Sequence, residues 1–164
     1  MKNKLLHRCV VSQVIDSSGN WILVKQASDR QDAGQYVSPV GGHVSVGEDE
    51  VSALKREAME EMGLKVQKFS IKGELIFNRS ILGRKENHLF LVYEIYSDDP
   101  YVTNHESVGT EIFTPKELAE QLASTPERFG DAFHVLIGKL YPELISRKSL
   151  LLQANAPATQ KRTS

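Results

Sequence analysis

The chain has 164 residues, of which 40% are hydrophobic and 25% charged, and these values fit one globular domain with a sizeable core. Its net charge of −1 excludes bulk electrostatic attraction to nucleic acid or to a membrane, so an anionic ligand would need local positive charge. The single cysteine, Cys9, excludes an internal disulfide and a metal site built from several cysteines.

The two ends of the chain carry no pattern that directs it to a membrane. The first residues lack the apolar run of a signal peptide, and no stretch approaches the roughly 18 apolar residues of a membrane span. We therefore expect a cytoplasmic protein. Residues 154–164 are small and polar with little to bury, so we expect a disordered tail after one domain over residues 1–153.

The first part of the chain alternates strand and turn signals. Residues 9–15 and 21–26 suit strands, and the polar turn at 16–20 between them predicts a hairpin. A polar loop should follow over residues 27–35. The segment 38–42, which contains a proline and two glycines, is expected to be a break that leads into a helix.

That helix should cover residues 49–62. Its apolar residues recur at helical spacing and should form a buried stripe: Val51, Leu54, Ala58 and Met62. We expect the small Ala53 to lie among the glutamates described below and to leave room for a ligand, with Glu50 pointing the same way. Gly63 is well placed to end the helix, because glycine readily adopts the left-handed conformation found there.

Strands return after the helix. We expect strand within residues 66–77, a polar connection over 78–85, and the most apolar strand of the chain over 88–96. Its apolar character predicts a central place in the sheet. A further short strand should cover residues 108–113.

The chain then turns to helices. Thr114, Pro115 and Glu117 match the N-cap, N1 and N3 positions of a helix start, and this helix should run to about Leu122. Another helix should cover residues 126–140, with a break at Pro142. The order of strands, helix, strands and helices predicts an α/β fold with a mixed sheet covered by helices.

Three glutamates, Glu57, Glu60 and Glu61, are the most informative feature of the chain. Their spacing places all three on one helix face, where like charges repel by about 0.2–0.5 kcal/mol per i, i+4 pair. A fold gains nothing from this arrangement unless a cation lies between the carboxylates. A hard divalent metal ion prefers carboxylate oxygen, so the glutamates predict metal-dependent chemistry, most naturally on a phosphate.

The surrounding residues extend this pattern. Five residues separate Gly42 from Glu48, seven more separate Glu48 from Arg56, and residues 56–64 read REAMEEMGL. The whole resembles the Nudix box, G-x5-E-x7-R-E-U-x-E-E-x-G-U, where U is apolar. All seven fixed positions match, an agreement that chance would give on the order of 10⁻⁹ times per window.

The resemblance implies a Nudix fold, with a mixed β-sheet in an α/β/α sandwich, and hydrolysis of a diphosphate joined to some group X with Mg²⁺ or Mn²⁺. It implies metal ligands at Glu57, Glu60 and Glu61. One of these glutamates would act as general base, with Glu57 the first candidate.

Other positions of the box also receive roles from the resemblance. Arg56 would pair with a glutamate and orient it, either Glu48 or Glu57. Gly41 and Gly42 would let the backbone approach the metal, and the carbonyl of either glycine is a candidate ligand.

Residues outside the box are further candidates. Nudix proteins often supply another metal ligand or base near the start of the strand that carries Glu86 and His88, and we expect Glu86 to be a metal ligand. His43 is a candidate contact to metal or phosphate. We expect His7 and Cys9 to be structural. Two aromatic residues either flank the substrate or belong to the core: Tyr36 and Phe77. Two basic residues either contact phosphate or are solvated: Lys25 and Arg84.

Flanking segments are similar to the isopentenyl-diphosphate isomerase-like branch of the family, namely residues 7–8, 23–26, 113–118 and 126–129. The true isomerase needs a cysteine in the loop before a histidine-containing turn. Here that loop, residues 38–43, reads SPVGGH. We therefore expect hydrolysis, with a prenyl-diphosphate isomerase-like enzyme as the alternative.

A non-catalytic Nudix sensor of a nucleotide or metabolite is a further alternative, although such domains usually lose box glutamates and this chain keeps them. We expect a small-molecule diphosphate substrate and no nucleic acid polymer or membrane partner. The sequence leaves open whether the protein is a homodimer. Group X should be selected by the loops at residues 28–35, 78–85 and 98–107.

Overall fold

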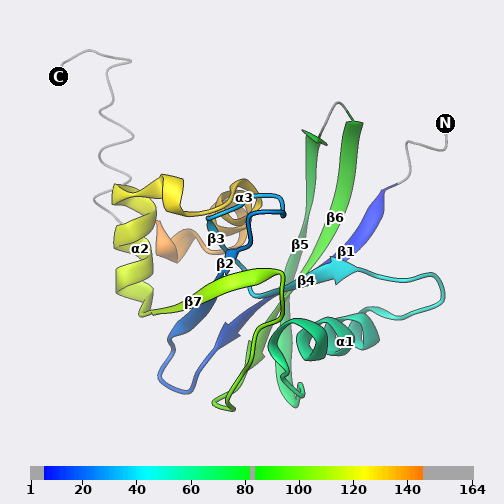
Figure 1. Cartoon of the computed structure of the whole chain (residues 1–164), viewed down its shortest axis with the longest axis horizontal. Coiled ribbons are helices and arrows are strands. Elements are labelled where there is room, and N and C mark those ends of the chain that lie inside the picture. Colours follow the sequence, from blue (N-terminus) through cyan, green and yellow to red (C-terminus); the bar gives the residue numbers. More distant parts are fainter. Residues whose placement is uncertain (1–5, 82–83, 146–164) are drawn as a thin grey trace.

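The computed structural model describes residues 6–81 and 84–145, and the tail expected over residues 154–164 lies outside them. Within this part of the chain, no helix is both long and apolar enough to cross a membrane. Seven strands belong to one sheet: β1 (His7–Ile15), β2 (Trp21–Gln26), β3 (Tyr36–Val37), β4 (Val40–His43), β5 (Lys68–Ile81), β6 (Arg84–Tyr96) and β7 (Ser107–Phe113). The α-helices are α1 (Glu50–Met62), α2 (Pro115–Ser124) and α3 (Asp131–Leu140), with 3-10 turns at Pro126–Arg128 and Pro142–Leu144 (Figure 1).

The sheet is mixed, as expected. Its strand order is β3-β2-β1-β6-β5, with β4 added to β1 and β7 added to β2. The β1–β6 pair is parallel, whereas the other pairs are antiparallel. The expected hairpin of β1 and β2 and the interior position of β6 are both confirmed.

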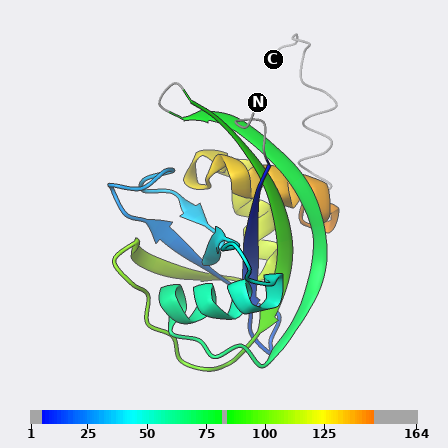
Figure 2. The same cartoon turned by 90° about the vertical axis from the view of Figure 1, so that its right-hand side faces the viewer.

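Helices cover both faces of this sheet (Figures 1 and 2). Residues of β1 alternate between two cores, because successive strand residues point to opposite faces. Val10 and Val14 pack with Leu54 of α1, whereas Cys9 packs with Phe133 of α3. The expected α/β/α sandwich is therefore confirmed.

Strands β4 and β2 pair with different parts of β1, and this arrangement shapes the site. The first half of β1 pairs with β4, from Cys9 opposite His43 to Ser12 opposite Val40. Its last residues, Val14 and Ile15, pair with β2 instead. Thus β2 and β4 lie on the same side of β1 and separate along it. The cavity described below is lined from both strands.

Helix α1 matches the expected segment. Asp49 caps its N-terminus by accepting a hydrogen bond from the Ser52 N–H, and Gly63 ends it in the left-handed conformation with φ of 62°. One expectation is wrong, because Ala53 is fully buried in the core and leaves no room for a ligand. Val51 is only half-buried, so the buried face is turned toward Glu57.

Three further expectations are corrected. The break at residues 38–42 contains a strand, β4, because its backbone pairs with β1. The connection expected at 78–85 is largely strand, since β5 continues to Ile81 and β6 begins at Arg84. The helix expected over 126–140 begins only at Asp131, because Phe129 adopts an extended conformation and is buried in the core. The capping box before α2 is confirmed.

Candidate active site

The carboxylate of Glu57 lies against the backbone of β4. The Glu57 side chain is only 12% exposed, which is low for a charged residue. A Cβ atom placed on Gly42 would overlap the carboxylate, so this approach is available only to glycine. The helix and the strand are therefore joined at Gly42 in a way that fixes one of the three glutamates.

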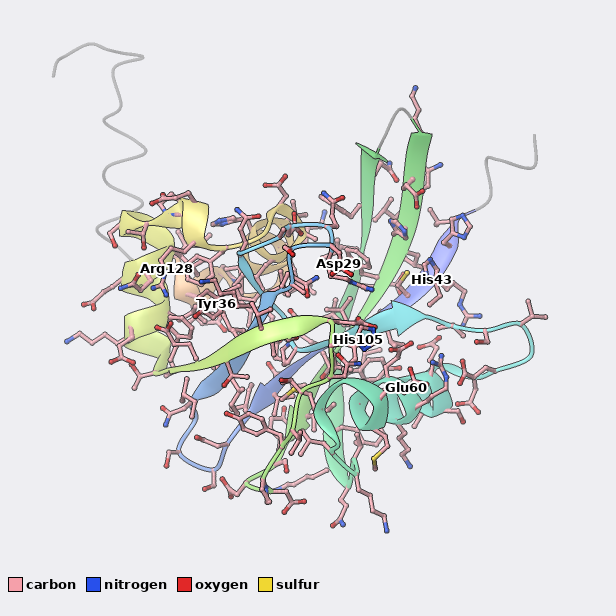
Figure 3. All side chains as sticks on the ribbon, in the orientation of Figure 1. Asp29, Tyr36, His43, Glu60, His105 and Arg128 are labelled. Carbon is pink, nitrogen blue, oxygen red and sulfur yellow. The ribbon has the colours of Figure 1, made fainter. Side chains whose placement is uncertain are left out.

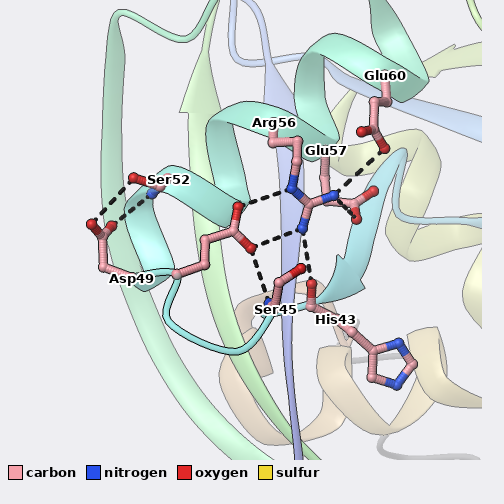
Figure 4. A network of polar contacts seen from close by, with 8 residues as sticks. His43, Ser45, Asp49, Ser52, Arg56, Glu57 and Glu60 are labelled. Atoms are coloured by element: carbon pink, nitrogen blue, oxygen red, sulfur yellow. Dashed lines mark hydrogen bonds and ion pairs between the residues drawn. The ribbon is translucent and has the colours of Figure 1, made fainter.

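Arg56 connects the loop before α1 with the glutamates (Figure 4). Its Nε and Nη2 donate to the two carboxylate oxygens of Glu48 at 2.9 and 3.0 Å, and Nη1 donates to Glu57 Oε2 at 2.9 Å. Nη2 also donates to the His43 carbonyl at 3.0 Å. Arg56 therefore holds both glutamates that the sequence offered as its partner.

The Glu48 carboxylate is committed to this network. Besides the two bonds from Arg56, it accepts one from the Ser45 N–H at 3.0 Å. The hydrogen bonds from Arg56, followed by the backbone bond from Ser45, lower the pKa of Glu48 to about 2. This residue orients Arg56 and the loop, and Arg56 in turn positions Glu57.

Glu61 lies beside Glu57 and lines the cavity. Burial raises the pKa of Glu61 well above its usual range, and the adjacent Glu57 adds to this by hydrogen bonding and charge. Glu106 contributes further, whereas the Gly41 N–H acts in the opposite direction. Glu60 differs from this buried pair, because its side chain is 55% exposed and lies 3.6 Å from Arg56 Nη1.

These carboxyl groups fit a hard divalent cation. Two buried carboxyls side by side cannot both ionise cheaply without a positive charge between them, and oxygen is the ligand type that Mg²⁺ and Mn²⁺ prefer. Glu61 offers its carboxyl group at the cavity wall, with Glu57 beside it and Glu60 on the next part of the same helix face. Figure 3 shows Glu60 on α1 and His43 at the end of β4 above it.

A second group of potential ligands lies on the neighbouring strands. Ligand atoms of Cys9, His43 and His88 all lie within 4.8 Å of one another. The His88 Nε2 is 3.5 Å from Glu86 Oε1, and the His7 ring centre is 5.7 Å from that of His43. Sulfur and imidazole ligands suit Zn²⁺ better than Mg²⁺.

The surroundings of Cys9 favour its neutral thiol over the thiolate. Burial, together with the charges of Glu57 and Glu86, raises the pKa of Cys9 to about 11. The group forms because β1 lies between β4 and β6, so that Cys9 faces His43 across one pair and His7 faces His88 across the other. The sequence predicts structural roles for Cys9 and His7, and residue spacing alone does not indicate that Cys9 lies near His43 and His88.

A cavity of about 290 Å³ opens beside the glutamates. Its polar wall includes Gly41, Gly42, His43, Glu61 and His88, which the sequence had singled out. Its apolar wall comes from four strands and α3: Val11, Val24, Val37, Phe90, Phe133 and Leu136. Such a mixture of apolar walls and few polar groups is typical of a small-molecule site.

The remaining candidates are placed as follows. Tyr36 and Phe77 pack against the core, where their rings meet Phe113 and Phe90. Lys25 lies on β2 outside the cavity wall, and the side chain of Arg84 lies outside the described part of the structure.

Two cavity residues, Arg30 and Glu106, were missed by the sequence analysis. Both lie in loops that it named as selecting group X. Nothing in the loop sequences distinguishes these two residues from their neighbours, because their role depends on the two loops meeting in space.

Comparison with known proteins gives three findings. A family model described as NUDIX domain matches residues 5–133. A relative from Clavibacter sepedonicus, named isopentenyl-diphosphate Delta-isomerase, is 25% identical over 161 residues, which cover 96% of this chain and 85% of the relative. A solved MutT protein from Methanosarcina mazei Go1 has a TM-score of 0.68 at 19% identity and covers 86% of this chain and 96% of its own.

A solved protein from Deinococcus radiodurans is similar to the same degree, with a TM-score of 0.68 at 22% identity. The alignment covers 82% of this chain and 83% of the Deinococcus chain. At these identities the solved structures show a shared fold.

Proposed function

The chain belongs to the NUDIX domain family, and from this we propose that it is a metal-dependent hydrolase that cleaves a phosphoanhydride bond in a nucleoside diphosphate derivative or a related diphosphate. One observation supports this above all others. The carboxyl groups of Glu57 and Glu61 lie together beside a cavity of about 290 Å³, which Glu61 lines. We further propose that the substrate is a free small molecule and that the enzyme is cytoplasmic.

Glu57, Glu60 and Glu61 would hold Mg²⁺ or Mn²⁺, with Glu86 and a carbonyl of Gly41 or Gly42 as further candidate ligands. When bound, the cation would neutralise diphosphate charge and lower the pKa of water. The donor set is consistent with this role, since every side chain in it offers carboxylate oxygen.

The protein residues would divide the remaining work. Arg56 positions the Glu57 carboxylate, which also packs against Gly42. Glu57 is our first candidate for the general base that accepts the proton of the attacking water, because these two contacts fix its orientation. The apolar wall formed by Phe90 and Phe133 would hold group X and keep water from it.

The test is a panel of nucleoside diphosphate derivatives and prenyl diphosphates, incubated with Mg²⁺ or Mn²⁺ and scored for phosphate-containing products. The proposal requires turnover of at least one compound by the wild type, with loss of turnover in Glu57→Gln. Binding of compounds across the panel without any turnover would contradict hydrolysis and favour the sensor alternative.

A second candidate function is isomerisation of a prenyl diphosphate. It is favoured by the place of Cys9, the single thiol, on the cavity wall beside His43 and His88, and by the name of the Clavibacter relative. The loop position where a true isomerase carries cysteine is here occupied by the SPVGGH segment. Incubation with isopentenyl diphosphate, followed by NMR of the double bond, separates isomerisation from release of phosphate.

A further inference from the structure

Two loops that are far apart in the sequence meet at the mouth of the cavity. Arg30 lies between β2 and β3, and Glu106 directly precedes β7. The Arg30 Nη2 is 3.1 Å from Glu106 Oε1, and the Ala27 N–H donates to the Glu106 carbonyl at 2.9 Å. Figure 3 labels Asp29 and His105, their sequence neighbours, on the two loops.

The position of Glu106 is fixed relative to the glutamate helix. Its N–H donates to Asn104 Oδ1 at 3.0 Å, and Asn104 Nδ2 donates to the Glu60 carbonyl of α1 at 3.1 Å. The charge of Glu106 also acts on Glu61. The loop therefore holds Glu106, and with it the Arg30 guanidinium, at the cavity that Glu61 also lines.

Arg30 differs in charge from the other ionisable side chains around the cavity. Among the described residues that line it, Arg30 is the one Lys or Arg, and the acidic ones are Asp32, Glu61 and Glu106. A diphosphate carries two adjacent anionic groups, and a cation at Glu57 and Glu61 would lie at one side of them. The Arg30 guanidinium is the cationic side chain of this lining, and a guanidinium binds phosphate oxygens in a planar, two-point geometry.

We propose that Arg30 is a phosphate-binding residue that contacts the diphosphate in the cavity, and that Glu106 is a positioning residue that holds the Arg30 guanidinium there. The proposal rests on the proposed function, since it requires the cavity to bind a diphosphate.

Binding of methylenediphosphonate in the presence of Mg²⁺, measured by calorimetry, tests this without any turnover. We expect Arg30→Gln to raise the Kd by about 10- to 100-fold, the loss of a hydrogen bond to a charged group. Arg30→Lys should recover part of the affinity. In the hydrolysis assay, Arg30→Gln should raise KM by a similar factor and change kcat by less than about threefold.

Arg128→Gln is the matched control. Arg128 also lies in an ion pair, 2.9 Å from Glu111, with a similarly exposed side chain, but it lies by α2 and outside the cavity wall (Figure 3). It should bind the diphosphonate like the wild type. Partly exposed ion pairs contribute little to stability, so all variants should melt close to the wild type.

The positioning role of Glu106 is tested by the KM and kcat of its variants. Glu106→Gln should raise KM with little change in kcat, and Glu106→Asp should restore part of the affinity. A fall in kcat without a rise in KM would contradict a positioning role.

The outcomes separate this proposal from the proposed function. Equal diphosphonate affinity of Arg30→Gln and Arg128→Gln would overturn the role of Arg30 even if the wild type hydrolyses diphosphates. Loss of affinity in Arg30→Gln alone would support it even if the wild type turns over no compound in the panel. A wild type that does not bind the diphosphonate would overturn both.

Discussion

The Glu57 carboxylate packs against Gly42 so closely that a methyl group at position 42 would occupy the same space. The contact joins α1 to β4 and thereby fixes the distance between the carboxylate and the cavity wall. Arg56 donates a hydrogen bond to the same carboxylate at 2.9 Å.

Replacing Gly42 with alanine should therefore displace Glu57 and reduce activity. We expect Gly42→Ala to lower the hydrolysis rate by at least about tenfold, with a smaller effect on stability, because the group that must move is the end of the Glu57 side chain rather than backbone. Chemical denaturation and the rate on the best substrate measure the two effects.

Gly109→Ala is the control for this change. It is also a glycine in a strand, and a Cβ atom there would meet no atom within 4 Å. Equal behaviour of the two alanine variants would contradict the steric role of Gly42.

Replacing Glu61 should separate activity from stability. We expect Glu61→Gln to lose at least about 100-fold in rate, as for loss of a metal ligand or its support. In metal-free buffer at pH 7 the same variant should melt at least about 2 °C higher, because a neutral amide avoids the buried charge beside Glu57.

The predicted rise in melting temperature follows from the pKa of Glu61, which is higher in the folded state than in the unfolded chain. A raised carboxyl pKa means that the ionised form costs stability once the pH exceeds the unfolded value of about 4.3. Glu60→Gln, at an exposed position, should change the melting temperature much less. A melting temperature of Glu61→Gln below that of the wild type would contradict the repulsion between the carboxyls.

The Glu48–Arg56 pair should give the opposite pH dependence on the acid side. The folded state lowers the pKa of Glu48 to about 2, so its stabilising effect is complete above the unfolded value of about 4.3 and is lost as the pH falls toward 2. We expect Glu48→Gln to flatten this part of the stability profile, measured by denaturation between pH 2 and pH 5. An unchanged slope would show that other carboxyls control the acid limb.

The sequence predicted those parts of the site that depend on spacing within one segment. Glu57, Glu61 and Arg56 lie on one helix whose period and caps are local, so their relative places follow from 3.6 residues per turn. It failed for Ala53, because the buried face of a helix depends on which strands pack against it, and β4 was not recognised.

The sequence also did not predict contacts between segments that are distant in the chain. Cys9 meets His43 and His88 only because β1 pairs with both β4 and β6. Likewise, Arg30 and Glu106 meet through two loops whose sequences show no shared pattern. Long-range pairing of this kind has no signature in a single sequence, since register and strand order are properties of the folded sheet.

Addition of Mg²⁺ should stabilise the protein through the glutamates. A cation that binds the folded state but not the unfolded chain raises stability by mass action, so the melting temperature should rise with Mg²⁺ concentration. EDTA should abolish both this shift and the activity, and excess Mg²⁺ or Mn²⁺ should restore them. In Glu57→Gln and Glu61→Gln the shift should be largely lost, whereas in Cys9→Ala it should persist, because a thiol is a poor ligand for Mg²⁺. A Mg²⁺ shift that survives in both glutamine variants would place the hard cation away from these two glutamates.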